Sequence, residues 1–210
     1  MLENANSNRI ATNVVNGATY NPLLGSDAGI MLVGSSQNTV VGNIVNNAGD
    51  GGILLTALSN NNRVENNVAN WTGDAGIVIG DSEANLIIGN TAQNNSDAGI
   101  GLNNANLNII FGNDFRFNPT GIELEDSSGN LIQENNASNS GASGIWLGAG
   151  SLQNHILDNE ANDNAANGIA IKAPALDPLG NPVAGNTVEG NTANNNLGRG
   201  IYVPNPATRS

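Results

Sequence analysis

The sequence predicts an all-β fold: a single parallel β-helix in which each repeat of about 23 residues forms one turn. The first observation is a glycine that opens a Gly-Ile-x-aliphatic quartet and recurs every 22 to 24 residues, apart from a last interval of 32. These glycines are Gly29, Gly52, Gly76, Gly99, Gly121, Gly144, Gly168 and Gly200. Self-similarity at this period indicates a repeat architecture, and a glycine at a corner predicts either a positive φ or a close approach of two backbones.

The second observation is a pair of asparagine columns that follows the quartets. The first column is Asn8, Asn38, Asn62, Asn85, Asn108, Asn130, Asn154 and Asn186, and the second stands five residues later at Asn13, Asn43, Asn67, Asn90, Asn113, Asn135, Asn159 and Asn191. Asparagine suits the corners of a coil because it tolerates left-handed backbone and its amide can bond to nearby backbone groups. Stacked amides can also bond to one another, so we expect asparagine ladders.

The third observation is that apolar residues alternate with other residues, which indicates short strands rather than helices. Three aliphatic columns would point inward, running from Ile30 to Ile201, from Leu32 to Val203 and from Ile10 to Val188. A further inward column of mostly small residues runs from Val15 to Ala193. Each strand would then pair with its counterpart one turn away, at about 4.8 Å. Ile77, Ile100 and Ile122 should therefore form one stack.

This pattern, GIxLxxxxxNxIxxNxxxNN, resembles the parallel β-helix repeats of the carbohydrate-binding and sugar-hydrolase group. That group includes NosD-like periplasmic proteins and mannuronan C5-epimerases. The resemblance covers residues 8 to about 203 and implies a right-handed coil, here of about 7–8 turns. The epimerase motif, Asp-Pro-His followed by an acid, does not recur: the one histidine lies in QNHIL, and Asp177-Pro178 is followed by Leu179. This departure argues against epimerase or related lyase activity.

Composition narrows the possible partners. The 210 residues should form one domain, with loop insertions at 17–26 and 173–185, and the unfinished end turns suggest a segment of a longer protein. The chain carries 18 acidic and 6 scattered basic residues, a net charge of −12, which argues against a nucleic-acid partner. There is no cysteine, no membrane span and no signal-peptide core. We expect an extracellular or cell-envelope location.

The outward positions of the quartets predict a glycan site. They gather Glu123, Glu125, Asp126, Trp146, Lys172 and Tyr202 within about four turns. Aromatic rings cover the apolar face of a sugar, and carboxylates accept hydrogen bonds from its hydroxyls. Glu123 and Glu125 would lie about 6.6 to 7 Å apart, a spacing at which a hydrolase pair could be built. Candidates for catalysis are Glu123, Glu125, His155 and Lys172, and the alternative is that these charges are simply solvated.

An acid stands two residues before the glycine in four consecutive repeats: Asp27, Asp50, Asp74 and Asp97. We name these four residues the acidic file. Stacked carboxylates must either turn into water or hold cations, and calcium prefers several oxygen ligands. The file therefore predicts a calcium site. The alternative is ordinary turn chemistry, in which Asp precedes a small residue and glycine.

The outward positions of the second motif are apolar over several turns: Leu86, Ile88, Ile109, Phe111, Leu131 and Leu157. A patch of this kind indicates a protein interface, and we expect self-association either through it or through the uncapped ends. The alternative is that a loop covers the patch.

Two functions remain open. The first is a non-catalytic β-helix module that serves as a scaffold or polysaccharide-binding surface. The second is a carbohydrate-active enzyme, or a fragment of one, which would be a polysaccharide lyase, epimerase or glycoside hydrolase. The first is favoured because no known acid–base motif recurs in the sequence.

Overall fold

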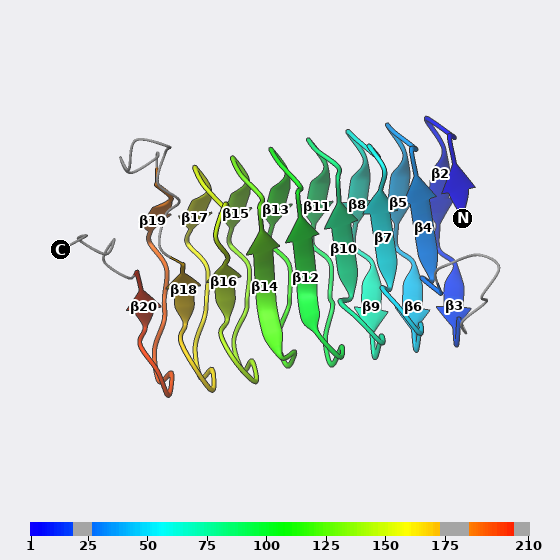
Figure 1. Ribbon diagram of the computed structural model, residues 1–210. Coiled ribbons are helices and arrows are strands. Elements are labelled where there is room, and N and C mark those ends of the chain that lie inside the picture. The colour runs from blue at the N-terminus through cyan, green and yellow to red at the C-terminus, as the bar shows by residue number, and fades with distance from the viewer. Residues whose placement is uncertain (19–26, 173–184, 204–210) are drawn as a thin grey trace.

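The computed structural model describes residues 1–18, 27–172 and 185–203 of the chain. All regular structure in these residues is β-strand, and successive turns stack into a column that runs from the N-terminus to the C-terminal strand β20 (Figure 1). The parallel β-helix predicted from the repeats is therefore confirmed. The insertions expected at 17–26 and 173–185 lie largely outside the described residues.

Two long parallel sheets form two faces of the coil. Sheet A contains β1 (Leu2–Glu3), β4 (Ile30–Val33), β7 (Ile53–Thr56), β10 (Ile77–Gly80), β12 (Ala98–Asn103), β14 (Thr120–Glu125), β16 (Ile145–Leu147), β18 (Ile169–Ile171) and β20 (Ile201–Tyr202). Sheet B contains β2 (Arg9–Ala11), β5 (Thr39–Val41), β8 (Arg63–Glu65), β11 (Leu86–Ile88), β13 (Ile109–Phe111), β15 (Leu131–Gln133), β17 (His155–Leu157) and β19 (Thr187–Glu189).

The third face is regular only near the N-terminus. Sheet C there contains β3 (Val14–Asn16), β6 (Ile44–Asn46) and β9 (Val68–Asn70). Beyond β9 the face continues as single parallel bridges through Thr91, Asp114, Asn136, Glu160 and Thr192. The pairing partner thus remains one turn away even where the strands shorten to one residue.

Equivalent repeat positions lie side by side in sheet A. Ile100 pairs in register with Ile77 on one side and with Ile122 on the other, as the repeat alignment predicted. Six uninterrupted steps connect the Ile30 strand to the Ile169 strand. This is slightly fewer than the 7–8 turns expected, because the first and last turns each include residues outside the described ranges.

The inward columns form one continuous core. Between residues 30 and 171, the two quartet columns are at most 6% exposed. The small-residue column is also buried and widens once, at the fully buried Phe115. Burying each aliphatic side chain contributes roughly 2 kcal/mol, so the stacked columns are the main source of stability. Ile201 and Val203 are exposed because they belong to the last described turn.

Both asparagine columns are unbroken ladders. Each ladder Nδ2 donates to the Oδ1 of the equivalent asparagine one turn on, at 3.1–3.2 Å in the first column. In the second column these bonds are 2.9–3.0 Å long. The same Oδ1 also accepts a backbone N–H, as when Asn113 Oδ1 accepts from Asn90 N. The buried amides are thereby satisfied, which removes the cost of burying them.

The ladder asparagines themselves do not adopt the left-handed backbone that the sequence analysis assigned to them. The residue immediately before every ladder position except Asn186 does, for example Leu107 (φ 57°) before Asn108 and Gly112 (φ 63°) before Asn113. The chain turns at that preceding residue, and the asparagine then points inward to bond the backbone. This division of roles explains why very different residues precede each asparagine.

The quartet glycines are required by close packing rather than by a positive φ. A Cβ on Gly52 would lie 2.6 Å from the Gly76 carbonyl oxygen, and one on Gly99 would lie 2.6 Å from Phe115 Cβ. None of the quartet glycines from Gly29 to Gly200 has a positive φ. Of the two reasons expected for these glycines, close backbone approach is confirmed.

Asn113→Ala should lower the free energy of unfolding by about 2–4 kcal/mol. The substitution removes the Nδ2 that donates to the buried Ile87 carbonyl and the Oδ1 that accepts from the Asn90 backbone N–H. The control is Asn103→Ala on the exposed end of β12, which should change stability by under about 1 kcal/mol. Urea unfolding followed by circular dichroism measures both, and equal losses would contradict a special role for the ladder.

Candidate functional site

The outer face of sheet A contains a hollow at its centre. The hollow has a volume of about 200 Å³ and is lined by Asp74, Ala75, Val78, Asp97, Gly101, Leu102, Asn103, Glu123 and Glu125. Gly101 lies between Val78 and Glu123 in the register of strands β10, β12 and β14, and it has no side chain to fill the space between them. The hollow therefore exists because one outward position of the column is glycine.

Two sets of acids that the sequence analysis treated separately meet at this hollow. Asp74 and Asp97 come from the acidic file, and Glu123 and Glu125 come from the predicted glycan set. They converge because the file lies just before the strands of sheet A, while the glutamates point outward from β14. Four carboxylates thus share one small, partly desolvated space.

The crowding of acids changes their titration. Burial, followed by the charges of Asp97 and Glu125, raises the pKa of Glu123 above its ordinary value of 4.5. Burial and the charge of Asp97 likewise raise the pKa of Asp74 above 3.8, against a hydrogen bond from the Ala75 backbone. The hollow therefore makes Asp74 and Glu123 harder to ionise than they would be in water.

The aromatic part of the predicted glycan set lies on the other side of Glu123. Trp146 pairs with Glu123 in register, and the Lys172 ammonium lies 5.9 Å from the centroid of the Trp146 ring. Tyr202 follows two strands further on, beyond Ala170, with the Arg199 guanidinium 4.8 Å from its ring. Carboxylates, an indole and a cation thus follow one another along sheet A.

Two predicted site residues lie away from this row. Asp126 occupies the corner after β14 with φ 44° and packs against Gly150 of the next turn. His155 begins β17 and is exposed on the outer face of sheet B. His155 therefore cannot act together with Glu123 on one small substrate. Asp177 of the Asp-Pro pair lies outside the described residues.

The acidic file is stacked as expected, since both Asp97 and Asp50 raise the pKa of Asp74 by their charge. Asp27, the first member of the acidic file, also lies among the described residues. Among the residues that the structure describes, no group of three or more His, Cys, Asp or Glu is arranged to hold a metal ion. Calcium binding by the file stays a prediction.

A second and larger groove was not predicted. It has a volume of about 490 Å³ and follows the corner between sheet B and the third face, lined by Gly89, Asn90, Thr91, Gly112, Asn113, Asp114, Glu134, Asn135, Asn136, Asp158 and Glu160. Listing the residue after each second-column asparagine (Thr91, Asp114, Asn136, Glu160) would have indicated it. Glycine at two of its corners leaves this side of the coil open.

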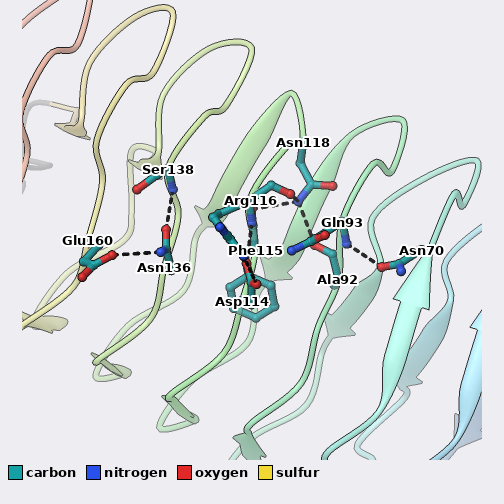
Figure 2. Close-up of polar contacts among 10 residues, drawn as sticks. All are labelled: Asn70, Ala92, Gln93, Asp114, Phe115, Arg116, Asn118, Asn136, Ser138 and Glu160. Atoms are coloured by element: carbon teal, nitrogen blue, oxygen red, sulfur yellow. Dashed lines mark hydrogen bonds and ion pairs between the residues drawn. The ribbon is translucent and has the colours of Figure 1, made fainter.

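The polar side chains at this groove mostly bond to one another. Arg116 donates two hydrogen bonds to Asp114 at 2.8 and 2.7 Å, and Asn136 Nδ2 donates to Glu160 at 2.9 Å (Figure 2). Burial raises the pKa of Asp114, but the hydrogen bonds from Arg116 and Gln93 hold it below its ordinary value. Most of the charge here is thus committed within the chain, unlike the four acids at the sheet A hollow.

Comparison with known proteins agrees with this architecture. The model of the family described as the right-handed beta helix region matches residues 63–208, and the chain belongs to this family. The coil is therefore right-handed, as the resemblance implied. Among curated protein sequences none matches. The part of the chain that the structure describes contains no helix long and apolar enough to cross a membrane.

Several solved structures share the fold. The A-module of mannuronan C-5 epimerase AlgE4 from Azotobacter vinelandii superposes with a TM-score of 0.76 at 15% identity, covering 98% of this chain and 58% of that one. The Dettilon tailspike protein gp208 gives 0.73 at 20% identity, covering 95% and 48%. The periplasmic alginate epimerase AlgG gives 0.64 at 17%, covering 96% and 60%. At these identities the likeness shows the fold alone, and this chain spans about half to three-fifths of those chains.

Glu123→Gln should stabilise the protein at neutral pH by up to about 1 kcal/mol. Because the folded pKa of Glu123 is raised, its ionisation disfavours the folded state: stability is highest below the unfolded pKa and falls as pH rises through the folded pKa. The Glu123→Gln variant should not show this decrease in stability with rising pH. Melting temperatures between pH 4 and pH 8 measure it, with Glu83→Gln at the exposed corner after β10 as control. An unchanged pH profile would contradict the assignment.

Proposed function

We propose that this chain is a glycan-binding β-helix module of an extracellular or cell-envelope protein, and that the glycan lies along the outer face of sheet A. The observation that carries the proposal is the row from the hollow, which four carboxylates line, to Trp146, which lies one strand beyond Glu123. Carboxyl groups bond sugar hydroxyls, and the indole covers the apolar face of a pyranose. The fold shared with polysaccharide-modifying enzymes and a tailspike is consistent with this function.

The negative charge along the row favours some classes of glycan over others. Asp74, Asp97, Glu123 and Glu125 line one hollow, and the chain carries a net charge of −12. A uronate polymer would add like charges to this site at a cost that rises as the site is desolvated. Lys172, over Trp146, is the nearest cation described along the row, and Arg199 lies further on, over Tyr202. We therefore propose a neutral, hydroxyl-rich polysaccharide as the ligand.

Trp146→Ala should weaken binding of a neutral polysaccharide by at least about tenfold, because it removes the surface on which the sugar stacks. The control is Trp71→Ala, since Trp71 is 59% exposed at a corner of the third face, away from the row. Affinity electrophoresis through gels containing neutral or anionic polysaccharides measures both. Retardation by none of the polymers, or an equal loss in the two variants, would contradict the proposal.

A second function is favoured by one observation, the raised pKa of Glu123. A carboxyl group whose pKa is raised releases its proton less readily and is better suited to act as a general acid, and Glu125 on the same strand face could serve as its partner. In this alternative the row is the cleft of a glycoside hydrolase or polysaccharide lyase. Non-catalytic binding remains the main proposal, because the epimerase motif is missing and His155 lies on another face.

Incubation with a polysaccharide panel tests this alternative. A hydrolase would release new reducing ends and a lyase would produce unsaturated uronates, and Glu123→Gln should abolish either activity while Glu83→Gln retains it. Binding without any turnover would confirm the non-catalytic module.

Calcium is a separate proposal for the acidic file. If the file holds the ion, calcium should release heat in calorimetry and raise the melting temperature, and Asp74→Asn should reduce both effects. The matched control is Asp163→Asn, an exposed acid at a corner of the third face. The absence of both heat and a change in melting temperature would contradict calcium binding by the acidic file.

A further inference from the structure

The outer face of sheet B is apolar over several adjacent turns. Its strands present two outward columns: the first column is Arg63, Leu86, Ile109, Leu131 and His155, and the second column is Glu65, Ile88, Phe111, Gln133 and Leu157. Ile109 is 41% exposed, and the other apolar members remain partly accessible. Three adjacent turns thus present aliphatic and aromatic side chains toward solvent.

We propose that this face, the sheet B face, binds the same face of a second copy, with the two coils side by side and parallel. The two-fold axis of the dimer would lie between the two coils and run parallel to them. This operation keeps each residue at its own height and places the first column of one copy opposite the second column of the other. The proposal does not depend on glycan binding, which uses sheet A.

Charge is the first argument for this partner. Arg63 and Glu65 lie at the same height in different columns, and within one chain they form an ion pair at 2.6 Å. In the parallel pair each Arg63 also faces the partner's Glu65, so that two guanidinium groups and two carboxylates alternate. Below them the apolar columns face each other, for example Ile109 against the partner's Phe111. The face is complementary to itself.

The margins of the face give the second argument. A Cβ added to Gly112, just after the second column, would meet no atom within 4 Å, so this corner is open. At the same height, Leu107 lies just before the first column and is 60% exposed. The parallel pair places each Leu107 beside the partner's open Gly112.

The antiparallel arrangement lacks these matches. With the coils reversed about β13, the centre of the patch, first column would face first column, and Glu65 would lie opposite the partner's Leu157 rather than opposite an arginine. The corner that carries Glu134 and Asp158 would also lie along the same margin in both copies. Like charges opposite one another disfavour that arrangement.

The size of the face sets the strength of the dimer. Sheet B has eight strands, so the face measures roughly 34 Å by 10 Å. This is less than the roughly 800 Å² per partner of stable complexes. The dimer should therefore be reversible, with a dissociation constant in the micromolar range or weaker.

Sedimentation equilibrium over a wide concentration range tests whether the dimer forms. The wild type should show a monomer–dimer equilibrium, and Phe111→Glu should weaken it at least tenfold. Phe117→Glu is the matched control, because Phe117 is also an exposed phenylalanine, 48% accessible, but lies at a corner of the third face. Circular dichroism verifies that each variant is folded. A wild type that remains monomeric at every concentration, or an equal effect of the control, would overturn the proposal.

Charge reversal tests the pairing. Arg63→Glu should weaken association several-fold, because a carboxylate at position 63 would then face the partner's Glu65. Adding Glu65→Arg should restore association, since the double variant recovers the alternation of charges. A double variant as weak as the single variant would contradict the proposed register.

Cross-linking tests the direction of the two coils. The chain has no cysteine, so Thr39→Cys and Thr187→Cys each introduce a single thiol. The two positions lie at opposite ends of the sheet B face, six strand steps or about 29 Å apart. In the parallel dimer each variant should cross-link with itself through a reagent that spans about 12 Å. Products that join position 39 to position 187 in a mixture, without self-linked products, would show the antiparallel arrangement and overturn the proposal.

Discussion

The structure depends on the register of its repeats. Each turn places a residue beside its equivalent one turn away, so a side chain that satisfies its neighbour does so along the whole coil. The ladders show the strength of this constraint: an asparagine can be buried only if the next turn offers another amide at the same height. A shift of one residue would break both ladders and expose the aliphatic columns together.

The same register frees the outer surface. Because the ladders and inward columns carry the stability, the outward columns can change from turn to turn without cost to the fold. The candidate functional features therefore lie where an outward column changes from one residue type to another. Sheet A changes from Val78 through Gly101 to Glu123 and Trp146, which produces first a hollow and then an outward-facing indole ring. Sheet B changes from the Arg63–Glu65 pair to an apolar band, which is the face proposed for dimerisation.

The interior could be predicted from the sequence because every repeat carries the same residue types at the same inward positions. The alignment of Ile77, Ile100 and Ile122 and both ladders followed directly from spacing. The meeting of Asp74 and Asp97 with Glu123 could not, because it depends on how a corner turns relative to the next strand. The left-handed residues before the ladder asparagines were also missed, since Leu107, Gly112 and Glu134 share a backbone conformation but no side-chain chemistry.

Hydrogen exchange of the side-chain amides measures the central constraint most directly. Exposed asparagine amides exchange rapidly, whereas a ladder Nδ2 that donates both to a backbone carbonyl and to the next asparagine is shielded from water. The account predicts strong protection for the Nδ2 protons of Asn90, Asn108, Asn113 and Asn130 and rapid exchange for exposed Asn103. Exchange of the ladder amides as fast as that of Asn103 would contradict the stacked register.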